Sequence, residues 1–504
     1  MIELGSENIL RKSGVLMHLS SLPSPYGIGT MGQAARDFVD FLQESGQAYW
    51  QILPICPTSY GNSPYQSYST FAGNPYFIDL DELKNMGILC CQDYENVAWM
   101  YDLEQVDYGI LNEKRFSVLQ KAAKNFLENP TEEFYVFCTE NEEWLPDYAL
   151  FMALKEVNKG KPWSEWMLPY RNRDERAIVQ AKYTYEMKIN FWKVFQFFFF
   201  KQWQDLKKYA NKKGIEIIGD LPIYVSLDSV DVWSHPELFQ LDENRNPTKV
   251  AGCPPDAFSD DGQLWGNPLY NWDYMEKNGF QWWIQRIQYI CKVYDVVRID
   301  HFRGFDSYYA IPFGEKTAQN GVWKKGPGMK FFRKLEEEIG RQRIIAEDLG
   351  DITESVRKLL EESGFPGMKV LEFAFDSNHV GENEYLPHNF VEKCVAYAGT
   401  HDNNTIEGWF EEITEDDAEY AREYLRLTEN NQSWGMLQAL WESPAGLVIA
   451  QMQDILSLGQ EARMNTPSTL ENNWSWRVRP EVFTHALAYK LRNMTTMYGR
   501  LQKK

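Results

Sequence analysis

The stretch Val296-Val297-Arg298-Ile299-Asp300-His301 is a short apolar run that ends in polar residues. Such a run predicts a buried β-strand, and its polar end marks the point where the strand leaves the sheet. The same pattern recurs along the chain. The predicted strands are residues 15–19, 49–53, 215–219, 296–299, 344–346, 368–373, 395–398 and 454–456.

Helical patterns lie between most of these strands, at 34–45, 354–363 and 188–211. In the last of these, Phe191, Phe195, Phe198 and Phe199 recur at helical spacing. Alternating strands and helices predict a parallel sheet, either a doubly wound open sheet or a barrel. The count of eight strands and the polar residues at their C-terminal ends favour the α/β class and a (β/α)8 TIM barrel.

We predict a single catalytic barrel over residues 1–504 with two insertions and no separate C-terminal β domain. The gap between 53 and 215 is too long for one crossover, so about 80–180 is expected to be a mostly helical insertion. About 224–274 is expected to be a second, loop-rich insertion that acts as a lid.

Composition excludes several classes of partner. The 504 residues include 51 basic and 72 acidic side chains, a formal net charge of −21, which argues against nucleic acid and anionic membranes. No apolar run approaches the roughly 18 residues of a membrane span, and residues 1–12 lack a signal-peptide pattern. The seven cysteines form no C-x-x-C pair. We therefore expect a cytoplasmic protein with reduced thiols.

Two motifs resemble a dinucleotide site and a metal site, but the residues around them do not support either. Gly27-Ile28-Gly29-Thr30-Met31-Gly32 fits G-x-G-x-x-G, but residues 20–26 separate it from the first strand and no acidic residue ends the second. His301 and His401 each neighbour an aspartate, yet no H-E-x-x-H or C-x-x-C pair accompanies them. We expect no cofactor and no catalytic metal.

Four acidic residues follow four different predicted strands: Asp220, Asp300, Glu347 and Asp402. A single acid at a strand end is most often a cap or an ion-pair partner. On a barrel, however, all four would converge on the face where active sites are built.

Glycoside chemistry needs such a set. A retaining enzyme uses an ionised carboxylate as nucleophile and a protonated carboxyl as acid and then base, about 5 to 5.5 Å apart. Arg298 lies two residues before Asp300 and so faces the same side, where it would keep Asp300 ionised. Glu347 is the better candidate for a raised pKa, and Asp402 would bind sugar hydroxyls. Aromatic residues, 15% of the chain, supply surfaces on which sugar rings stack, although most must lie in the core.

Long ordered motifs run through nearly the whole chain. They are His18-Leu19-Ser20-Ser21-Leu22-Pro23, Ser63-Pro64-Tyr65-Gln66-Ser67, Gly73-Asn74-Pro75-Tyr76, Gly219-Asp220-Leu221-Pro222-Ile223-Tyr224, Gly262-Gln263-Leu264-Trp265-Gly266-Asn267-Pro268-Leu269-Tyr270, Arg298-Ile299-Asp300-His301-Phe302-Arg303-Gly304, Glu347-Asp348-Leu349-Gly350, Thr400-His401-Asp402-Asn403 and Arg463-Met464-Asn465. In these motifs the chain closely resembles the amylomaltases, the 4-α-glucanotransferases of glycoside hydrolase family 77 in the α-amylase clan.

The resemblance implies Asp300 as nucleophile, Glu347 as general acid/base and Asp402 as transition-state stabiliser. It also implies a set of substrate-binding residues: Tyr65, Asp220, Trp265, Arg298, His301, His401 and Asn465. Residues 252–265 would form a loop over the cleft. Family patterns often carry an aromatic residue after Pro-Pro-Asp in that loop, where this chain has Ala257, so the resemblance does not extend to a stacking contact there.

The implied reaction moves a 1,4-α-D-glucan segment to the 4-hydroxyl of glucose or a maltooligosaccharide through a covalent glucosyl-enzyme. The partners would be maltooligosaccharides and other α-1,4-glucans. Two alternatives stay open: an α-glucan hydrolase of the same clan, and a catalytically silent sugar-binding protein with an amylase-like barrel. The sequence also leaves open the oligomeric state and the preferred glucan length.

Overall fold

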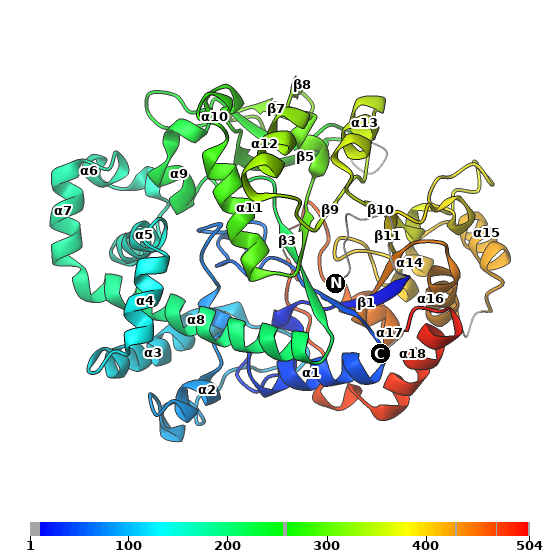
Figure 1. Cartoon of the computed structure of the whole chain (residues 1–504), viewed down its shortest axis with the longest axis horizontal. Helices are drawn as coiled ribbons and strands as arrows, with labels where there is room; N and C mark the ends of the chain where they lie inside the picture. Colours follow the sequence, from blue (N-terminus) through cyan, green and yellow to red (C-terminus); the bar gives the residue numbers. More distant parts are fainter. Residues whose placement is uncertain (1–10, 256–259, 429–430, 470, 502–504) are drawn as a thin grey trace.

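Eight parallel strands form the centre of the molecule in a computed structural model, which describes residues 11–255, 260–428, 431–469 and 471–501. Their order is β10 (Gly367–Val370), β11 (Cys394–Tyr397), β12 (Leu447–Gln451), β1 (Lys12–Leu16), β2 (Tyr49–Gln51), β3 (Glu216–Leu221), β6 (Val296–Ile299) and β9 (Ile344–Ala346). The ends of this sheet also meet, because the Ala346 N–H donates to the Pro366 carbonyl at 3.0 Å. The sheet is therefore a closed barrel (Figure 1), which confirms the predicted fold class.

The prediction for the eighth strand was wrong. Residues 454–456 belong to the helix α17 (Met452–Ile455) and its cap, and the strand is β12, directly before it. All five residues of β12 are buried, as expected for a barrel strand covered on both faces. No acidic residue directly follows the apolar run Leu447-Val448-Ile449-Ala450, so β12 lacks the acidic end that marks several of the other strands.

The other predicted strands shift by a few residues at most. The strand predicted at 15–19 is β1, which ends at Leu16, and Leu19 opens a 3-10 turn. Strand β3 runs through Asp220, which therefore lies within the strand. The three predicted helices are confirmed as α1 (Gln33–Glu44), α13 (Glu354–Ser363) and α8 (Glu186–Lys212).

A helical region lies between β2 and β3. It contains α2 (Leu80–Asn85), α3 (Tyr108–Leu127), α4 (Glu132–Glu140), α5 (Leu145–Val157), α6 (Leu168–Arg171) and α7 (Glu175–Thr184). These helices lead into α8, whose central residues Val194–Phe200 are all buried. Helices α3, α4 and α5 contact α8, and Figure 1 shows the group on one side of the barrel.

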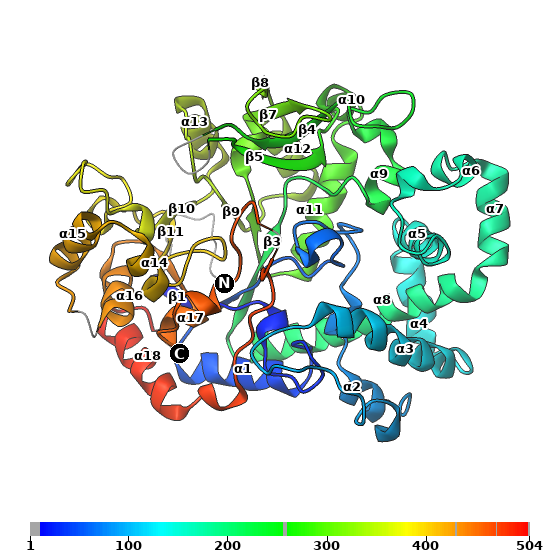
Figure 2. The ribbon, with the colours of Figure 1, turned by 180° about the vertical axis from the view of Figure 1, so that it is seen from behind.

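Residues 224–277, which include the predicted insertion at about 224–274, form several short helices and strands. They contain α9 (Val230–Ser234), β4 (Lys249–Cys253), β5 (Gln263–Pro268) and α10 (Trp272–Lys277). Two further strands from the segment after β6, β7 (Ser307–Pro312) and β8 (Val322–Lys325), complete an antiparallel sheet in the order β5-β4-β7-β8. Figure 2 shows this small sheet at one end of the molecule.

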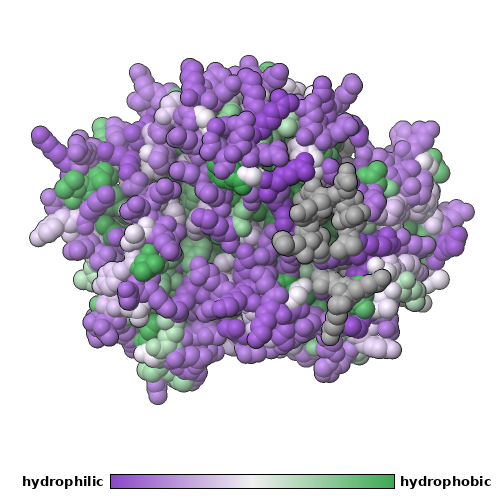
Figure 3. Space-filling model, in the orientation of Figure 1, coloured by the Kyte–Doolittle hydropathy of each residue, from purple (hydrophilic) through white to green (hydrophobic). Residues whose placement is uncertain are grey.

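The remaining helices cover the barrel. They are α11 (Gln281–Val293), α12 (Met329–Ile339), α14 (Ile406–Glu412), α15 (Glu415–Leu425), α16 (Gln432–Glu442) and α18 (His485–Met497). Helix α18 packs on α1, so the last described helix lies beside the first. The face in Figure 3 is mostly hydrophilic, with small separate apolar patches. Among the described residues, no helix has the length and apolar character that a membrane crossing requires.

Candidate active site

Three acidic side chains lie at the C-terminal ends of neighbouring barrel strands. Asp220 pairs with Arg298 between β3 and β6, and Ile299 pairs with Ala346 between β6 and β9. Asp300 and Glu347 directly follow the last residues of β6 and β9. The Glu347 N–H still donates to the Ile299 carbonyl at 3.0 Å, so the ladder continues to this point. Adjacent strands lie about 4.8 Å apart, which makes the backbones of Asp300 and Glu347 immediate neighbours.

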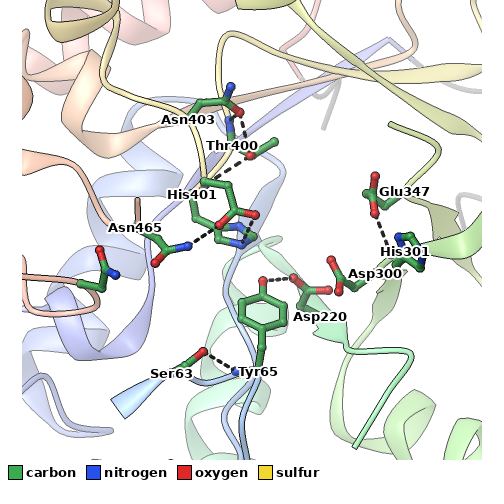
Figure 4. A network of polar contacts seen from close by, with 12 residues as sticks. Ser63, Tyr65, Asp220, Asp300, His301, Glu347, Thr400, His401, Asn403 and Asn465 are labelled. Carbon is green, nitrogen blue, oxygen red and sulfur yellow. Dashed lines mark hydrogen bonds and ion pairs between the residues drawn. The ribbon is translucent and has the colours of Figure 1, made fainter. Parts of the chain in front are cut away.

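The Arg298 guanidinium joins two of these carboxylates. Its Nη1 lies 2.8 and 2.7 Å from the two oxygens of Asp220 and 3.1 Å from Asp300 Oδ1. Arg298 is only 4% exposed. The Tyr65 hydroxyl donates to Asp220 Oδ2 at 2.6 Å, which brings a third predicted substrate ligand to this network (Figure 4). The structure therefore brings together Tyr65, Asp220, Arg298 and Asp300.

Glu347 is held by backbone groups. Its Oε2 accepts the His301 N–H at 2.6 Å and its Oε1 accepts the Leu349 N–H at 2.9 Å. Burial raises the pKa of Glu347, and these bonds, with Arg298, oppose the rise. Burial also raises the pKa of Asp300, against the charge of Arg298. Of the two carboxyl groups, only that of Asp300 contacts the Arg298 guanidinium, and this contact favours the ionised form of Asp300.

Asp402 lies on the turn after β11. Two other predicted site residues, Asn465 and His401, contact its carboxylate. Asn465 Nδ2 donates to Asp402 Oδ1 at 2.7 Å, and His401 Nε2 lies 3.4 Å from Oδ2. The His401 ring stacks on Tyr65 with centroids 5.1 Å apart. Figure 4 shows His401 and Asn465 on one side of the network and Asp300, His301 and Glu347 on the other.

His301 and Trp265 form an aromatic contact beside the acids. Their ring centroids are 4.8 Å apart in an edge-on arrangement. His301 has left-handed backbone angles, φ 51° and ψ 49°, and burial lowers its pKa to about 3, so the ring is neutral. Trp265 lies on β5, at the end of the segment 252–265 that was predicted to cover the cleft. Residues 256–259 of that segment, including Ala257, lie outside the described residues.

Glu372 is a buried acid that sequence reasoning missed. It follows β10, and a Cβ placed on Gly399 would lie 2.5 Å from its Oε1, so the carboxyl packs on the turn that carries Asp402. Burial, and then Asp454, raise the pKa of Glu372 well above the usual value. The signal was available, since Glu372 directly follows an apolar run, but the predicted strand 368–373 included it as an interior residue.

His18 lies beneath His401 and also escaped notice as a site residue. Both line a small cavity of about 10 Å³, close to the size of one water molecule. His18 Nδ1 is buried and has no protein partner, and burial, followed by His401, lowers the pKa of His18 to about 3.

No group of three or more His, Cys, Asp or Glu side chains is arranged to hold a metal ion within the described part of the chain. The carboxyl groups of the site are of a kind that can transfer a proton, attack an electrophilic carbon and hydrogen-bond to a polyhydroxyl ligand.

A closed (β/α)8 barrel with paired carboxylates at adjacent strand ends defines the chain as a barrel protein of the glycoside-processing type. Residues 17–484 match the family described as 4-alpha-glucanotransferase, and the chain belongs to this family.

Individual relatives agree with that assignment. A 4-alpha-glucanotransferase from Clostridium butyricum is 51% identical over 489 residues, 96% of this chain and 100% of the relative. One from Thermus thermophilus is 45% identical over 503 residues, covering 97% and 99%. The solved structure of amylomaltase from Streptococcus agalactiae in complex with acarbose superposes with a TM-score of 0.95 at 47% identity and covers 98% of this chain and 100% of its own.

Proposed function

We propose that the protein is a retaining 4-α-glucanotransferase, which transfers a 1,4-α-D-glucan segment to the 4-hydroxyl of glucose or a maltooligosaccharide. One observation carries the mechanism: Asp300 and Glu347 follow paired residues of adjacent strands, and Arg298 contacts only Asp300 of the two. Strand spacing of about 4.8 Å suits the separation of about 5 to 5.5 Å that a retaining pair needs.

In the first step, Glu347 donates its proton to the glycosidic oxygen of the donor. An Asp300 oxygen attacks the anomeric carbon, the carbon–oxygen bond breaks, and the leaving glucan departs with the proton. The product is a covalent glucosyl-enzyme. Arg298 supports this step because it favours the ionised form of Asp300.

In the second step, the Glu347 carboxylate takes the proton of an acceptor 4-hydroxyl. The acceptor oxygen attacks the anomeric carbon and releases Asp300, so two inversions give net retention. The His301 and Leu349 N–H groups stabilise the carboxylate form of Glu347 between the two steps.

Asp402 acts from the opposite side of the site. We assign it hydrogen bonds to the donor sugar hydroxyls, which strengthen as the oxocarbenium-like transition state forms. Asn465 and His401 orient its two oxygens. Tyr65, Trp265, Asp220 and His301 are assigned to the walls that hold the sugar.

Preference for a sugar hydroxyl over water must come from acceptor positioning, because the same carboxylates would hydrolyse the intermediate. Oriented binding reaches effective molarities of roughly 10⁵ to 10⁸ M and supplies about 7 to 11 kcal/mol. The aromatic contact between Trp265 and His301 is a suitable rigid wall for an acceptor.

We place the reaction in the cytoplasm. The structure shows no disulfide at six of the cysteines, as a reducing compartment favours: Cys56, Cys90, Cys91, Cys138, Cys291 and Cys394.

Incubation with maltotriose tests the proposal. The expected products are free glucose together with glucans longer than the trisaccharide, resolved by size. Shortened products alone would identify a hydrolase, and unchanged maltotriose a sugar-binding protein. Asp300→Asn and Glu347→Gln are each expected to abolish turnover while glucan binding persists, and substantial residual activity in either would contradict the assigned role.

A further inference from the structure

A groove of about 450 Å³ lies between the edge strand β8 and the loop that follows β9. Its lining includes Arg303, Asp306, Ser307, Trp323, Asp351 and Ser355. It belongs neither to the carboxylate network around Asp300 nor to the small cavity beneath His401.

The aromatic side of the groove is Trp323, which is 38% exposed on a strand whose four residues all face solvent. Its ring is held in place. The Arg303 guanidinium lies 3.9 Å from the Trp323 ring centroid, and the Tyr309 ring meets it edge-on at 5.2 Å. Arg303 in turn donates to the Asp351 carbonyl. A rigid, partly exposed indole is the kind of surface on which the apolar face of a sugar packs at little entropic cost.

The polar side of the groove carries groups that suit hydroxyls. Asp306 Oδ2 accepts from Ser307 Oγ at 3.0 Å and from Ser355 Oγ at 2.9 Å, so the carboxylate is fixed in orientation. The lining mixes cations with carboxylates, since Lys324 and Lys325 stand near Asp306 and Asp351. An anionic ligand would meet two carboxylates here, whereas a neutral polyhydroxyl ligand finds both donors and acceptors.

The groove adjoins the site of the reaction through the chain itself. Arg303 lies in the short 3-10 helix Phe302–Phe305, which begins directly after His301, and its charge contributes to the low pKa of His301. Asp351 lies on the loop that starts at Glu347. The two walls of the groove are therefore continuations of the segments that carry the nucleophile and the acid/base, on the same end of the barrel.

We propose that this groove binds a remote segment of the α-1,4-glucan chain, with Trp323 as the stacking surface and Asp306 as the hydroxyl acceptor. The inference rests on the proposed function, because it assigns the groove to a longer stretch of the same polymer. A short glucan fills the reaction site without reaching Trp323, so the groove contributes only to long chains.

Kinetics with substrates of two lengths test the proposal. Trp323→Ala is expected to raise KM for amylose at least fivefold and to leave kcat and KM for maltotriose unchanged. Tyr183→Ala removes an aromatic side chain that is 80% exposed on α7 and serves as the matched control, with both substrates unaffected. An unchanged KM for amylose in Trp323→Ala would overturn the inference, whereas a wild type inactive on maltotriose would instead overturn the proposed function.

Binding without turnover gives an independent readout. In native gels that contain amylose, saturating acarbose blocks the reaction site, and the wild type should still migrate slowly. Trp323→Ala should migrate at its amylose-free rate, and Trp323→Phe, which keeps an aromatic ring, should recover part of the retardation. If the wild type with saturating acarbose migrates in the amylose gel as fast as in a gel without amylose, the groove does not bind glucan.

Discussion

Arg298→Met tests the electrostatic reasoning most directly. The substitution keeps an unbranched side chain of about the length of the arginine aliphatic stem but removes the cation that contacts Asp220 and Asp300. An opposite charge within about 4 to 6 Å lowers a carboxyl pKa by about 1 to 3 units, so its loss should raise the pKa of Asp300 by that amount. At pH values below the new pKa, each further unit of pH lowers the ionised fraction of Asp300 about tenfold, and kcat/KM falls with it.

The assay is glucose release from maltotriose as a function of pH. The wild type should give a bell-shaped profile, because activity falls at low pH as Asp300 gains a proton and at high pH as Glu347 loses one. Burial raises both pKa values, so both limbs should lie above the ordinary carboxyl range. In Arg298→Met the acidic limb should move upward by about 1 to 3 units, with a loss of about 10- to 1,000-fold in kcat/KM at pH values below it.

Two controls separate this effect from misfolding. Arg298→Lys keeps the charge but not the planar guanidinium, so its acidic limb should shift less than that of Arg298→Met. Loss of one partner from a buried ion pair costs about 3 to 5 kcal/mol, so the variants should be compared at temperatures where circular dichroism shows a folded barrel. An acidic limb that stays in place in a folded Arg298→Met enzyme would refute the assigned role of Arg298.

Three further outcomes follow from other buried contacts. Glu372→Gln should keep activity within a few fold and Glu372→Ala should lose about tenfold in kcat, because the buried carboxyl is neutral; equal losses in the two variants would argue for an ionised Glu372. Asn465→Ala should lower kcat on maltotriose about 10- to 100-fold through the lost hydrogen bond to the Asp402 carboxylate, with a small change in KM. Burial lowers the pKa of His18 from 6.5 to about 3 in the folded protein. Between these pH values the unfolded chain binds a proton at His18 that the folded protein does not bind. The free energy of unfolding therefore falls as the pH drops below 6.5. Denaturant titrations of His18→Gln from pH 4 to 6 should therefore show a pH slope of the unfolding free energy smaller by about 1.4 kcal/mol per unit, and an unchanged slope would contradict a buried neutral ring.

The barrel was predictable because its strands are short apolar runs separated by helices. Strands at 296–299 and 344–346 were predicted to the residue, since polar side chains end each run. The strand β12 was missed because its buried run ends in Gln451, which is not acidic. The strand was instead predicted to begin at Asp454, an acidic residue that lies in α17. Burial on both faces, which defines a barrel strand, leaves no periodic pattern to correct such an error.

The candidate site was predictable as a set of residues but only partly as a network. Acids at strand ends must converge on a barrel, and Arg298 two residues before Asp300 must share its face. Contacts between distant segments could not be read from spacing. The bond from Asn465 to Asp402, the packing of Glu372 on Gly399, and the groove at Trp323 all depend on loop conformations that only the folded chain defines.

The left-handed turn at His301 has a mechanical consequence. Its amide donates to Glu347, so the residue that follows Asp300, the proposed nucleophile, also holds Glu347, the proposed acid/base. We expect this hydrogen bond to couple the two groups, so that a displacement of one is followed by the other and the gap between them changes little. A glucan that pushes on the end of β6 would thus shift both groups as one unit, without changing the distance that the chemistry requires.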